Sequence, residues 1–500
     1  MEQITLKSKN TGKSARRALL FLLSALAGTF LFSQTTSPLY HDWGYDSAMF
    51  QTIGKYWAQG YLPYVDLFDH KGPIIFFLNA VGYALGDRTG VFALQVLFIA
   101  AAEYAAFVML KNRTGEKVSV VLSALLPLFL VVNWNEGNTT EEYILPFLML
   151  SYGKMLDWRD GLCERNTHDP KYAALYGFTF AFALLTRVTN ALGLCIGVFL
   201  IVITLGAKGE WKNLLFNALG FLIGTVLLLV PFSLYFAYHG ALYDMWYGTL
   251  LFNMDYMNTS SDSIIGGGLV QLLVTTRMYL FGWVLVIAEL WHFAAVEKKK
   301  AINLFWFAVA LPATAFMYTL NNYAHYGIIL LPFLYIAFAE LSGKSARPRF
   351  AHATRVLAAF LFALALFSSG LKIYRNVTEV LPPQAYERYG DEYAPLVELL
   401  TEEDKESFIA WDCPRRIYLD TGLRPCFPYF TLQQWMSINS DLFAETIRDR
   451  FDESDIRCVI AFTLPEEEGR RPVIKDILDK DYYAAAQTTN GIYTLYRRLK

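Results

Sequence analysis

Long apolar runs decide what this chain can fold into. Three of them approach or reach the roughly 20 residues that a helix needs to cross ~30 Å of hydrocarbon. They are ARRALLFLLSALAGTFLF, LFNALGFLIGTVLLLVPFSLYF and RVLAAFLFALALFSSG. Of the 500 residues, 55% are hydrophobic and only 18% are charged, too few charges for an ordinary soluble protein of this length. The sequence therefore predicts a polytopic α-helical membrane protein.

The charged residues are distributed unevenly along the chain. Of the 88 Lys, Arg, Asp and Glu residues, 40 lie from Lys372 onward. This shift predicts a multispan membrane domain over 1–371 and a polar domain over 372–500. In the polar part, ESFIAWD, RRIYLDTG, IRCVIAFTL and GIYTLYRR are typical of short strands, and DLFAETIRDRF has helical spacing. We therefore expect a small C-terminal α/β domain.

Basic residues between the apolar runs predict the topology. Lys and Arg in short loops favour the cytoplasmic side of a membrane. With a cytoplasmic N-terminus, every loop that alternation places inside is basic, provided that residues 73–86 form a re-entrant or juxtamembrane helix and do not cross. About eleven spans then put the C-terminal domain outside the plasma (inner) membrane. The candidate spans are 17–33, 89–110, 117–133, 143–157, 172–186, 188–206, 213–236, 268–296, 302–319, 327–342 and 354–371. The basic residues of the inner loops are Lys111, Arg113, Lys117, Lys154, Arg159, Arg165, Lys171, Lys208, Lys212, Lys298, Lys299, Lys300, Lys344, Arg347, Arg349 and Arg355.

The N-terminus and the cysteines leave alternatives open. The N-terminal stretch also fits a signal peptide cleaved near residues 25–27, but its apolar run continues to Phe32, which favours an uncleaved first span. None of the five cysteines has the spacing of a zinc site. If the polar domain lies outside the cytoplasm, Cys413 and Cys426 are candidates for a disulfide.

The loop after the first span, YDSAMFQTIGKYWAQGYLPYVDLFDHKGP, is unusually aromatic and charged. Its apolar residues recur at helical spacing, which predicts a helix lying in the membrane interface. Asp46 stands at the start of that helix, either as its cap or as a functional carboxylate. Asp66, Asp69, His70 and Lys71 follow, either as a binding site or as an interfacial anchor whose lysine meets lipid headgroups. The apolar stripe consists of Met49, Ile53, Tyr56, Trp57 and Gly60.

Other predicted outer segments carry further candidates. Glu141 and Glu142 in NWNEGNTTEEYILPF are either functional or the acidic first turn of a helix capped by a threonine. Arg187 in LLTRVTN is either a ligand-binding residue or half of a structural ion pair. His325 in NNYAHYGIILLPF stands at a span entrance, where an interfacial role is the alternative.

Together, outer carboxylates and cations suit a reaction between an anionic lipid and a polar acceptor: a carboxylate acts as general base, and cations stabilise a departing phosphate.

These motifs resemble those of the GT-C superfamily, glycosyltransferases that use polyprenyl-phosphate sugars. GYLPYVDLFDHKGP, preceded by Asp46, is similar to the first-loop motif. GNTTEEYILPF resembles the second acidic loop, HYGIILLPF a later motif, and IAWDCPRRIYLDTGLRP the outer C-terminal domain. The closest resemblance is to the bacterial branch akin to protein O-mannosyltransferases and the lipid A aminoarabinose transferase.

The resemblance implies roles for the candidate residues. Asp46 matches the catalytic base and Lys71 the lysine that meets the lipid phosphate. Glu141 and Glu142 together match one acidic position that orients acceptor or donor. The remaining candidates, expected to bind substrate, are Asp66, Asp69, Arg187 and His325.

The implied reaction is an inverting displacement on a polyprenyl-phosphate-linked sugar at the outer face of the membrane. The acceptor stays open between a protein, a lipid and a cell-envelope glycan. Asp42 and Asp46 lack D-x-D spacing, so no metal or other cofactor is expected, and the partners are membrane lipids and no nucleic acid. A transporter or flippase of lipid-linked saccharides and an envelope scaffold are alternatives. Acidic residues in outer loops, not at midplane, favour the enzyme.

Overall fold

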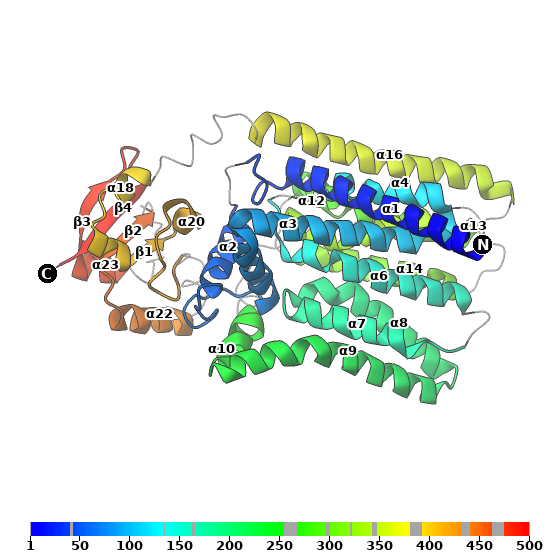
Figure 1. Ribbon diagram of the computed structural model, residues 1–500, viewed down its shortest axis with the longest axis horizontal. Helices are drawn as coiled ribbons and strands as arrows, with labels where there is room; N and C mark the ends of the chain where they lie inside the picture. The colour runs from blue at the N-terminus through cyan, green and yellow to red at the C-terminus, as the bar shows by residue number, and fades with distance from the viewer. Residues whose placement is uncertain are drawn as a thin grey trace. The chain divides into compact units, whose positions relative to one another are not determined.

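The computed structural model describes most of the chain. The described residues are 2–40, 44–134, 136–162, 166–254, 268–295, 301–320, 323–342, 348–380, 393–431, 441–462 and 475–499. They are mainly helical, with one sheet near the C-terminus (Figure 1). Asp42, Arg165, Lys298, Lys299, Lys300, Lys344 and Arg347, named above, lie outside the described residues.

The chain forms two compact units, each built from separate segments. The bundle unit consists of Met1–Leu39, Phe92–Phe232 and Asp262–Asn376. The mixed unit consists of Tyr40–Val91, Ser233–Ser261 and Val377–Lys500. The expected boundary between 371 and 372 stays a prediction.

Five helical stretches are long and apolar enough to cross a membrane, by length and composition. They are Gly12–Phe32, Pro73–Thr114, Val188–Ala207, Trp211–Tyr238 and Pro348–Glu379. The described residues yield six if Leu272–Met278 and Leu280–Ala295, bent by 77°, count as one broken span. Shorter apolar helices occupy Ile302–Met317 and Ala324–Glu340. The helical membrane architecture is thus confirmed, while the count of about eleven spans stays a prediction.

The described residues of the bundle unit are mainly helices that pack against one another. Helix α13 packs against α14 and α15, and α6 packs against α7. Close approach of α7 and α9 depends on glycine, because a Cβ at Gly224 would lie 1.9 Å from the carbonyl oxygen of Ala174. The main helices of this unit are α1 (Glu2–Phe32), α4 (Glu116–Ala124), α5 (Leu126–Leu130), α6 (Thr140–Gly161), α7 (Pro170–Leu184), α8 (Leu192–Ala207), α9 (Trp211–Tyr238), α12 (Gly268–Met278), α13 (Leu280–Ala295), α14 (Phe305–Met317), α15 (Leu331–Glu340) and α16 (Ala351–Arg375), with the 3₁₀ helices η1 (Val188–Ala191) and η5 (Ala324–Leu330).

Helix α3, Pro73–Thr114, contains a sharp break at Gly86 and Asp87. Asp87 has a φ of 52°, in the left-handed region, and the chain folds back so closely that a Cβ at Gly90 would lie 2.0 Å from the carbonyl oxygen of Gly82. The expected helix at 73–86 is therefore present and is separated from the helix that follows it.

The mixed unit contains a four-stranded sheet in the order β1-β2-β4-β3. Its strands are β1 (Phe408–Trp411), β2 (Cys458–Phe462), β3 (Tyr482–Gln487) and β4 (Tyr493–Arg498). β1 and β2 are parallel, and the other pairs are antiparallel. The helices of this unit include α2 (Asp46–Trp57), α10 (Leu242–Trp246), α18 (Ala394–Glu398), α19 (Glu402–Glu406), α20 (Ile417–Thr421), α22 (Asp441–Glu453) and α23 (Lys475–Asp481).

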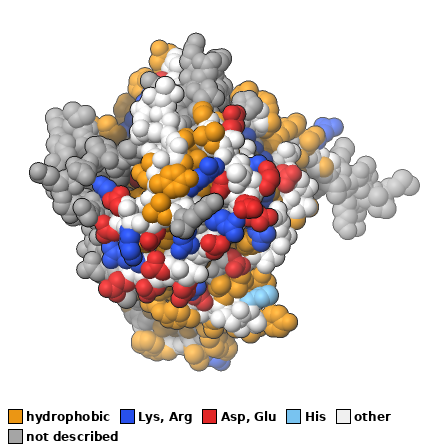
Figure 2. Space-filling model, turned by 90° about the vertical axis from the view of Figure 1, so that its left-hand side faces the viewer, with side chains coloured by type: hydrophobic (Ala, Val, Ile, Leu, Met, Phe, Trp, Pro, Cys, Tyr) orange, Lys and Arg blue, Asp and Glu red, His pale blue; other side chains and the backbone are white. Residues whose placement is uncertain are grey.

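One hydrophobic core joins the sheet to the first loop. It combines Ile409 and Val459 of the sheet with Phe451 of α22, and it also contains Phe68 and Phe252. The face drawn in Figure 2 shows acidic and basic side chains interspersed, as is typical of a surface exposed to water.

The predicted C-terminal elements were partly right. β1, β2, β4 and α22 lie where the pattern placed strands and a helix. The strand expected at RRIYLDTG is wrong: α20 forms there and ends at Gly422, whose φ of 68° favours glycine. β3 was missed because YYAAAQ lacks β-branched residues and exposes most of its side chains. Cys413 and Cys426 are free thiols, so the disulfide is absent.

Candidate active site

Asp46 is the first residue of α2 and is not its cap, because Tyr45 occupies the cap position. Its Oδ1 instead accepts a hydrogen bond from Nη1 of Arg415 at 2.7 Å. The Asp46 side chain is 31% exposed and that of Arg415 is 14% exposed. A carboxylate at this site is therefore both paired and accessible.

Three consecutive residues, Asp69, His70 and Lys71, form a compact charged turn in the same unit. Asp69 Oδ1 accepts the Lys71 backbone N–H at 3.1 Å and lies 3.4 Å from His70 Nδ1. Lys71 Nζ lies 2.8 Å from His70 Nε2. Burial raises the pKa of the Asp69 carboxyl; the charges of Lys71 and Arg415 oppose the rise, and that of Asp46 adds to it. We call these residues, Asp46, Asp69, His70, Lys71 and Arg415, the Asp46 cluster.

The backbone of this turn is fixed from several sides. Tyr64 adopts a φ of 73° and donates its hydroxyl to the carbonyl oxygen of Lys71 at 2.7 Å. Asn253 donates to the carbonyl oxygen of His70 at 2.7 Å. Asp66 Oδ2 accepts the Leu62 N–H at 2.6 Å, so its side chain holds the preceding turn. These contacts hold the turn in one conformation, and Asp66 stabilises the turn before it.

Three residues of the apolar stripe are buried in protein, so the expectation that the whole stripe lies in the membrane interface is corrected. Trp57 is half-buried, and Gly60, just after α2, is exposed. Met49, Ile53 and Tyr56 are at most 4% exposed. Tyr56 donates its hydroxyl to the carbonyl oxygen of Leu423 at 3.1 Å. A helical stripe alone does not distinguish burial in lipid from burial in protein.

In the bundle unit, Glu142 has the structural role that was its alternative. It forms a capping box with Thr139 at the start of α6. Its Oε2 accepts a hydrogen bond from Gln95 at 2.5 Å. Burial raises the pKa of Glu142 to about 7, although hydrogen bonds from Gln95 and Thr139 lower it.

Glu141 instead meets the cations. Its Oε1 accepts a hydrogen bond from Arg187 Nη1 at 3.1 Å, and Arg187 stacks 3.4 Å from the ring centre of Tyr326. Burial would raise the pKa of Glu141, but the charges of His325 and Arg187 lower it below its ordinary value. Glu141, Arg187, His325 and Tyr326 form the Glu141 cluster.

The candidate site residues predicted from the sequence therefore lie in both units. The side chain of Asp66 stabilises a turn, and that of Glu142 caps a helix. Sequence reasoning missed Arg415 as a site residue, although its segment, IAWDCPRRIYLDTGLRP, stood out. Within the described ranges, no group of three or more His, Cys, Asp or Glu residues gathers as metal ligands do. The cofactor expectation stays a prediction.

A separate cavity of about 270 Å³ lies between α7, α8 and α9. Its polar end is His168, whose ring nitrogens contact Asn217 Oδ1 at 2.5 Å and the Tyr176 hydroxyl at 3.2 Å. The remaining lining is mainly apolar and contains none of the expected site residues.

Comparisons with known proteins give a matching family and structures with a similar fold. The family model described as "Putative competence-induced protein Ccs4 N-terminal domain" matches residues 6–356. No curated protein matches the chain. The aminoarabinose transferase ArnT from Cupriavidus metallidurans, solved bound to undecaprenyl phosphate, is similar in structure with a TM-score of 0.56, 13% identity and 98% of each chain covered. The oligosaccharyltransferase AglB from Archaeoglobus fulgidus, solved with an inhibitory peptide and a dolichol-phosphate, has a TM-score of 0.48 and 10% identity over 98% of this chain and 75% of that one.

The resemblance found in the loop motifs is confirmed for the fold, which is GT-C-like. The match over residues 6–356 assigns the family, and the chain belongs to the family of the competence-induced protein Ccs4 N-terminal domain.

Proposed function

We propose that the protein is an inverting glycosyltransferase that moves a sugar from a polyprenyl-phosphate donor to an acceptor hydroxyl. The observation that carries this proposal is the Asp46 cluster, in which an accessible carboxylate lies within one unit with two strong cations, Lys71 and Arg415. General-base chemistry and phosphate departure need these two kinds of group side by side. The GT-C-like fold supports the same reaction, since ArnT was solved with undecaprenyl phosphate bound.

The reaction is a single displacement. The acceptor oxygen forms a bond to the anomeric carbon while Asp46 takes the hydroxyl proton. The bond from that carbon to the phosphate oxygen breaks, and its electron pair leaves with the polyprenyl phosphate. Lys71 and Arg415 offset the charge that develops on the phosphate. Asp46 suits the base better than Asp69, which is only 4% exposed.

The Glu141 cluster is proposed to orient a substrate. Glu141, and not Glu142, has the cationic partners that tie it to Arg187 and His325. Its buried ion pair is preformed, so a sugar hydroxyl or acceptor amide would meet fixed polar groups.

The cellular setting belongs to the same proposal. About eleven crossings, a cytoplasmic N-terminus and an outer C-terminal domain in the plasma (inner) membrane put the Asp46 cluster on the outer face. The acceptor is a protein, a lipid or a cell-envelope glycan.

The test measures release of free polyprenyl phosphate from a panel of polyprenyl-phosphate sugars. Wild type is expected to release it with one donor, and Asp46→Asn to lose at least about 100-fold in rate, because the base is gone. Glu116→Gln, which changes an exposed carboxylate in the other unit, serves as control. Equal rates for wild type and Asp46→Asn would refute Asp46 as the base.

A transporter of lipid-linked saccharides is the second candidate. Glu103 in α3 and Glu289 in α13 are fully buried within apolar helices, and ionisable residues in such places often mark transport paths. Movement of a fluorescent lipid-linked sugar between leaflets of a vesicle, without release of polyprenyl phosphate, would favour this candidate.

A further inference from the structure

Two adjacent arginines before α20 point to different partners. Arg415 donates from Nη1 to Asp46 Oδ1 at 2.7 Å. Arg416 lies with its Nε 3.5 Å from Asp420 Oδ2, one helical turn ahead in the sequence. The PRR segment therefore presents one guanidinium to the first loop, while the other contacts Asp420 and Tyr393 of the C-terminal part.

Contacts that follow Arg415 in the sequence hold its segment against the first loop. Tyr56 donates to the carbonyl oxygen of Leu423, and Arg424 lies 4.6 Å from the ring centre of Tyr61. Helices α2 and α20 are in contact within the mixed unit.

A second attachment fixes the charged turn to the same C-terminal segment. The Phe68 N–H donates to the carbonyl oxygen of Pro428 at 2.8 Å, and the Phe68 and Tyr429 rings are 5.3 Å apart. Phe68 immediately precedes Asp69. The guanidinium of Arg415 and the charged turn are therefore held in register by backbone contacts that do not depend on the ion pair itself.

We propose that Arg415 is an exchangeable phosphate-binding residue, which pairs either with Asp46 or with the phosphate of a polyprenyl-phosphate lipid. The inference rests on the proposed function and deepens it. The structure shows the arrangement with Asp46. Transfer of the guanidinium to the phosphate releases the Asp46 carboxylate to accept the proton of the acceptor hydroxyl.

Charge and geometry favour such an exchange. A phosphate offers the planar guanidinium two parallel hydrogen bonds. The sugar-linked donor is a phosphodiester with one negative charge, and the polyprenyl phosphate that leaves carries up to about two. Asp46 is nearly one-third exposed, so water can solvate it when the pair opens. A neighbouring cation makes a carboxylate a weaker base. Moving Arg415 away would therefore make Asp46 a better base at the moment when the donor is bound.

The test is equilibrium binding of undecaprenyl phosphate to the purified full-length protein in nanodiscs, without any sugar donor or acceptor. Arg415→Gln is expected to weaken binding about 10- to 100-fold, because a charge-assisted pair is lost. Arg416→Gln is the matched control and should change binding by no more than about 2-fold.

Asp46→Asn gives a readout that a purely structural role would not move. It removes the competitor for the guanidinium, so binding should tighten by at least about 3-fold. The same variant should lose transfer activity. If Arg415→Gln unfolds on heating well below wild type, Arg415→Lys replaces it, keeping the charge without the planar fork, and should weaken binding to an intermediate degree.

The outcomes separate the two proposals. Failure of the wild type to bind undecaprenyl phosphate would contradict the proposed function and the inference with it. Wild-type binding together with unchanged binding by Arg415→Gln, or weaker binding by Asp46→Asn, would overturn the exchange alone.

Discussion

Two adjacent glutamates show how far environment separates identical side chains. Glu141 and Glu142 follow each other in the first turn of α6, before its apolar residues begin, and both are 1% exposed. One pairs with Arg187 and the other closes a capping box, because neighbouring helix positions point about 100° apart. The sequence predicted the acidic pair but not which member had the cation.

Replacing each glutamate by glutamine is expected to separate their roles. Glu141→Gln leaves Arg187 without a countercharge in a buried place, and turnover should fall about 100-fold if the cluster orients a substrate. Glu142→Gln keeps a capping-box residue and should change turnover less than about 3-fold. Steady-state release of polyprenyl phosphate by both variants is the measurement, and similar losses in both would contradict the assignment.

Glu142 should also make stability depend on pH. Its pKa is raised by burial from 4.5 to about 7, so the folded protein retains a proton that the unfolded chain loses between these values. Stability from this group is complete below pH 4.5 and declines as the pH rises to about 7, by about 3 kcal/mol. Thermal unfolding of wild type and Glu142→Gln at pH 5 and pH 8 checks this. The variant should be the more stable protein at pH 8 only, and a gap that is equal at both pH values would argue against it.

The pairing of Arg415 with Asp46 could not be predicted from sequence patterns, for a physical reason. It stands 369 positions from Asp46 in the sequence, and no spacing rule relates residues so far apart. Its partner became evident only when the C-terminal segment was seen against α2.

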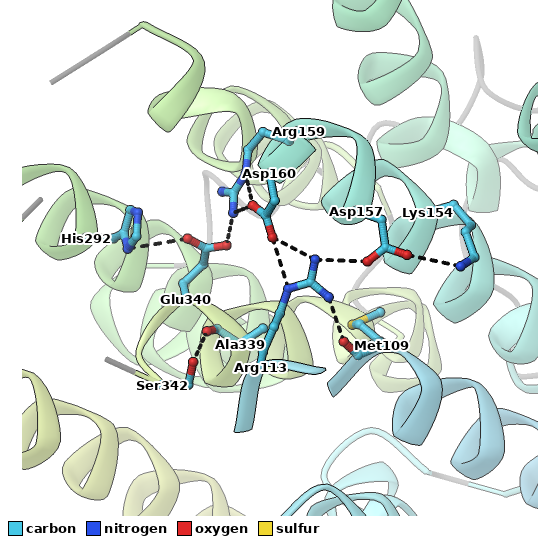
Figure 3. Close-up of polar contacts among 10 residues, drawn as sticks. All are labelled: Met109, Arg113, Lys154, Asp157, Arg159, Asp160, His292, Ala339, Glu340 and Ser342. Carbon is cyan, nitrogen blue, oxygen red and sulfur yellow. Dashed lines mark hydrogen bonds and ion pairs between the residues drawn. The ribbon is translucent and has the colours of Figure 1, made fainter. Parts of the chain in front are cut away.

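At the scale of elements, an ion-pair network ties four helices together in the bundle unit (Figure 3). Arg113 of α3 pairs with Asp157 and Asp160 of α6. Arg159 of α6 pairs with Glu340 of α15, which also lies 3.4 Å from His292 of α13. The sequence had interpreted these basic residues only as loop charges that set topology.

The buried ion pair of this network should contribute more to the free energy of unfolding than the exposed pair. Arg159→Met leaves Glu340, whose side chain is 2% exposed, without its guanidinium, and should lower the free energy of unfolding by about 3–5 kcal/mol. Lys154→Met removes a pair with Asp157, which is 43% exposed, and should cost less than about 1 kcal/mol. Thermal unfolding in detergent compares them; equal melting temperatures would show that the network adds nothing.

Local patterns predicted elements well where apolar residues form a continuous run or recur at a regular spacing. The apolar helices, β1, β2, β4 and α22 belong to this class. α20 was misread because a helix of five residues is too short to show helical spacing, and its apolar pair Ile417 and Tyr418 also fits a short buried strand. The α2 stripe was placed in the interface because its protein partners come from distant segments. Tyr56 contacts Leu423, and Trp57 packs against Tyr235 and Phe236.

At the scale of the whole molecule, the mixed unit is assembled from the first loop, a middle segment and the C-terminal part. Removal of residues 377–500 should therefore expose α2 and the charged turn. Limited trypsin digestion is expected to cleave the truncated chain at Lys55 and Lys71 at least about 10-fold faster than the full chain. Equal protection of these sites would mean that the loop is ordered without its C-terminal partners.

The 369-residue separation of Asp46 and Arg415 also fixes the delay between their synthesis on the ribosome. Ribosomes add about 5–20 residues per second, so roughly 20–70 s pass between the synthesis of these two side chains. For all that time the growing chain holds a carboxylate whose guanidinium does not yet exist. On the proposed function, the Asp46 cluster is therefore incomplete while the apolar helices between these two residues are inserted, and transfer cannot begin before Arg415 is made.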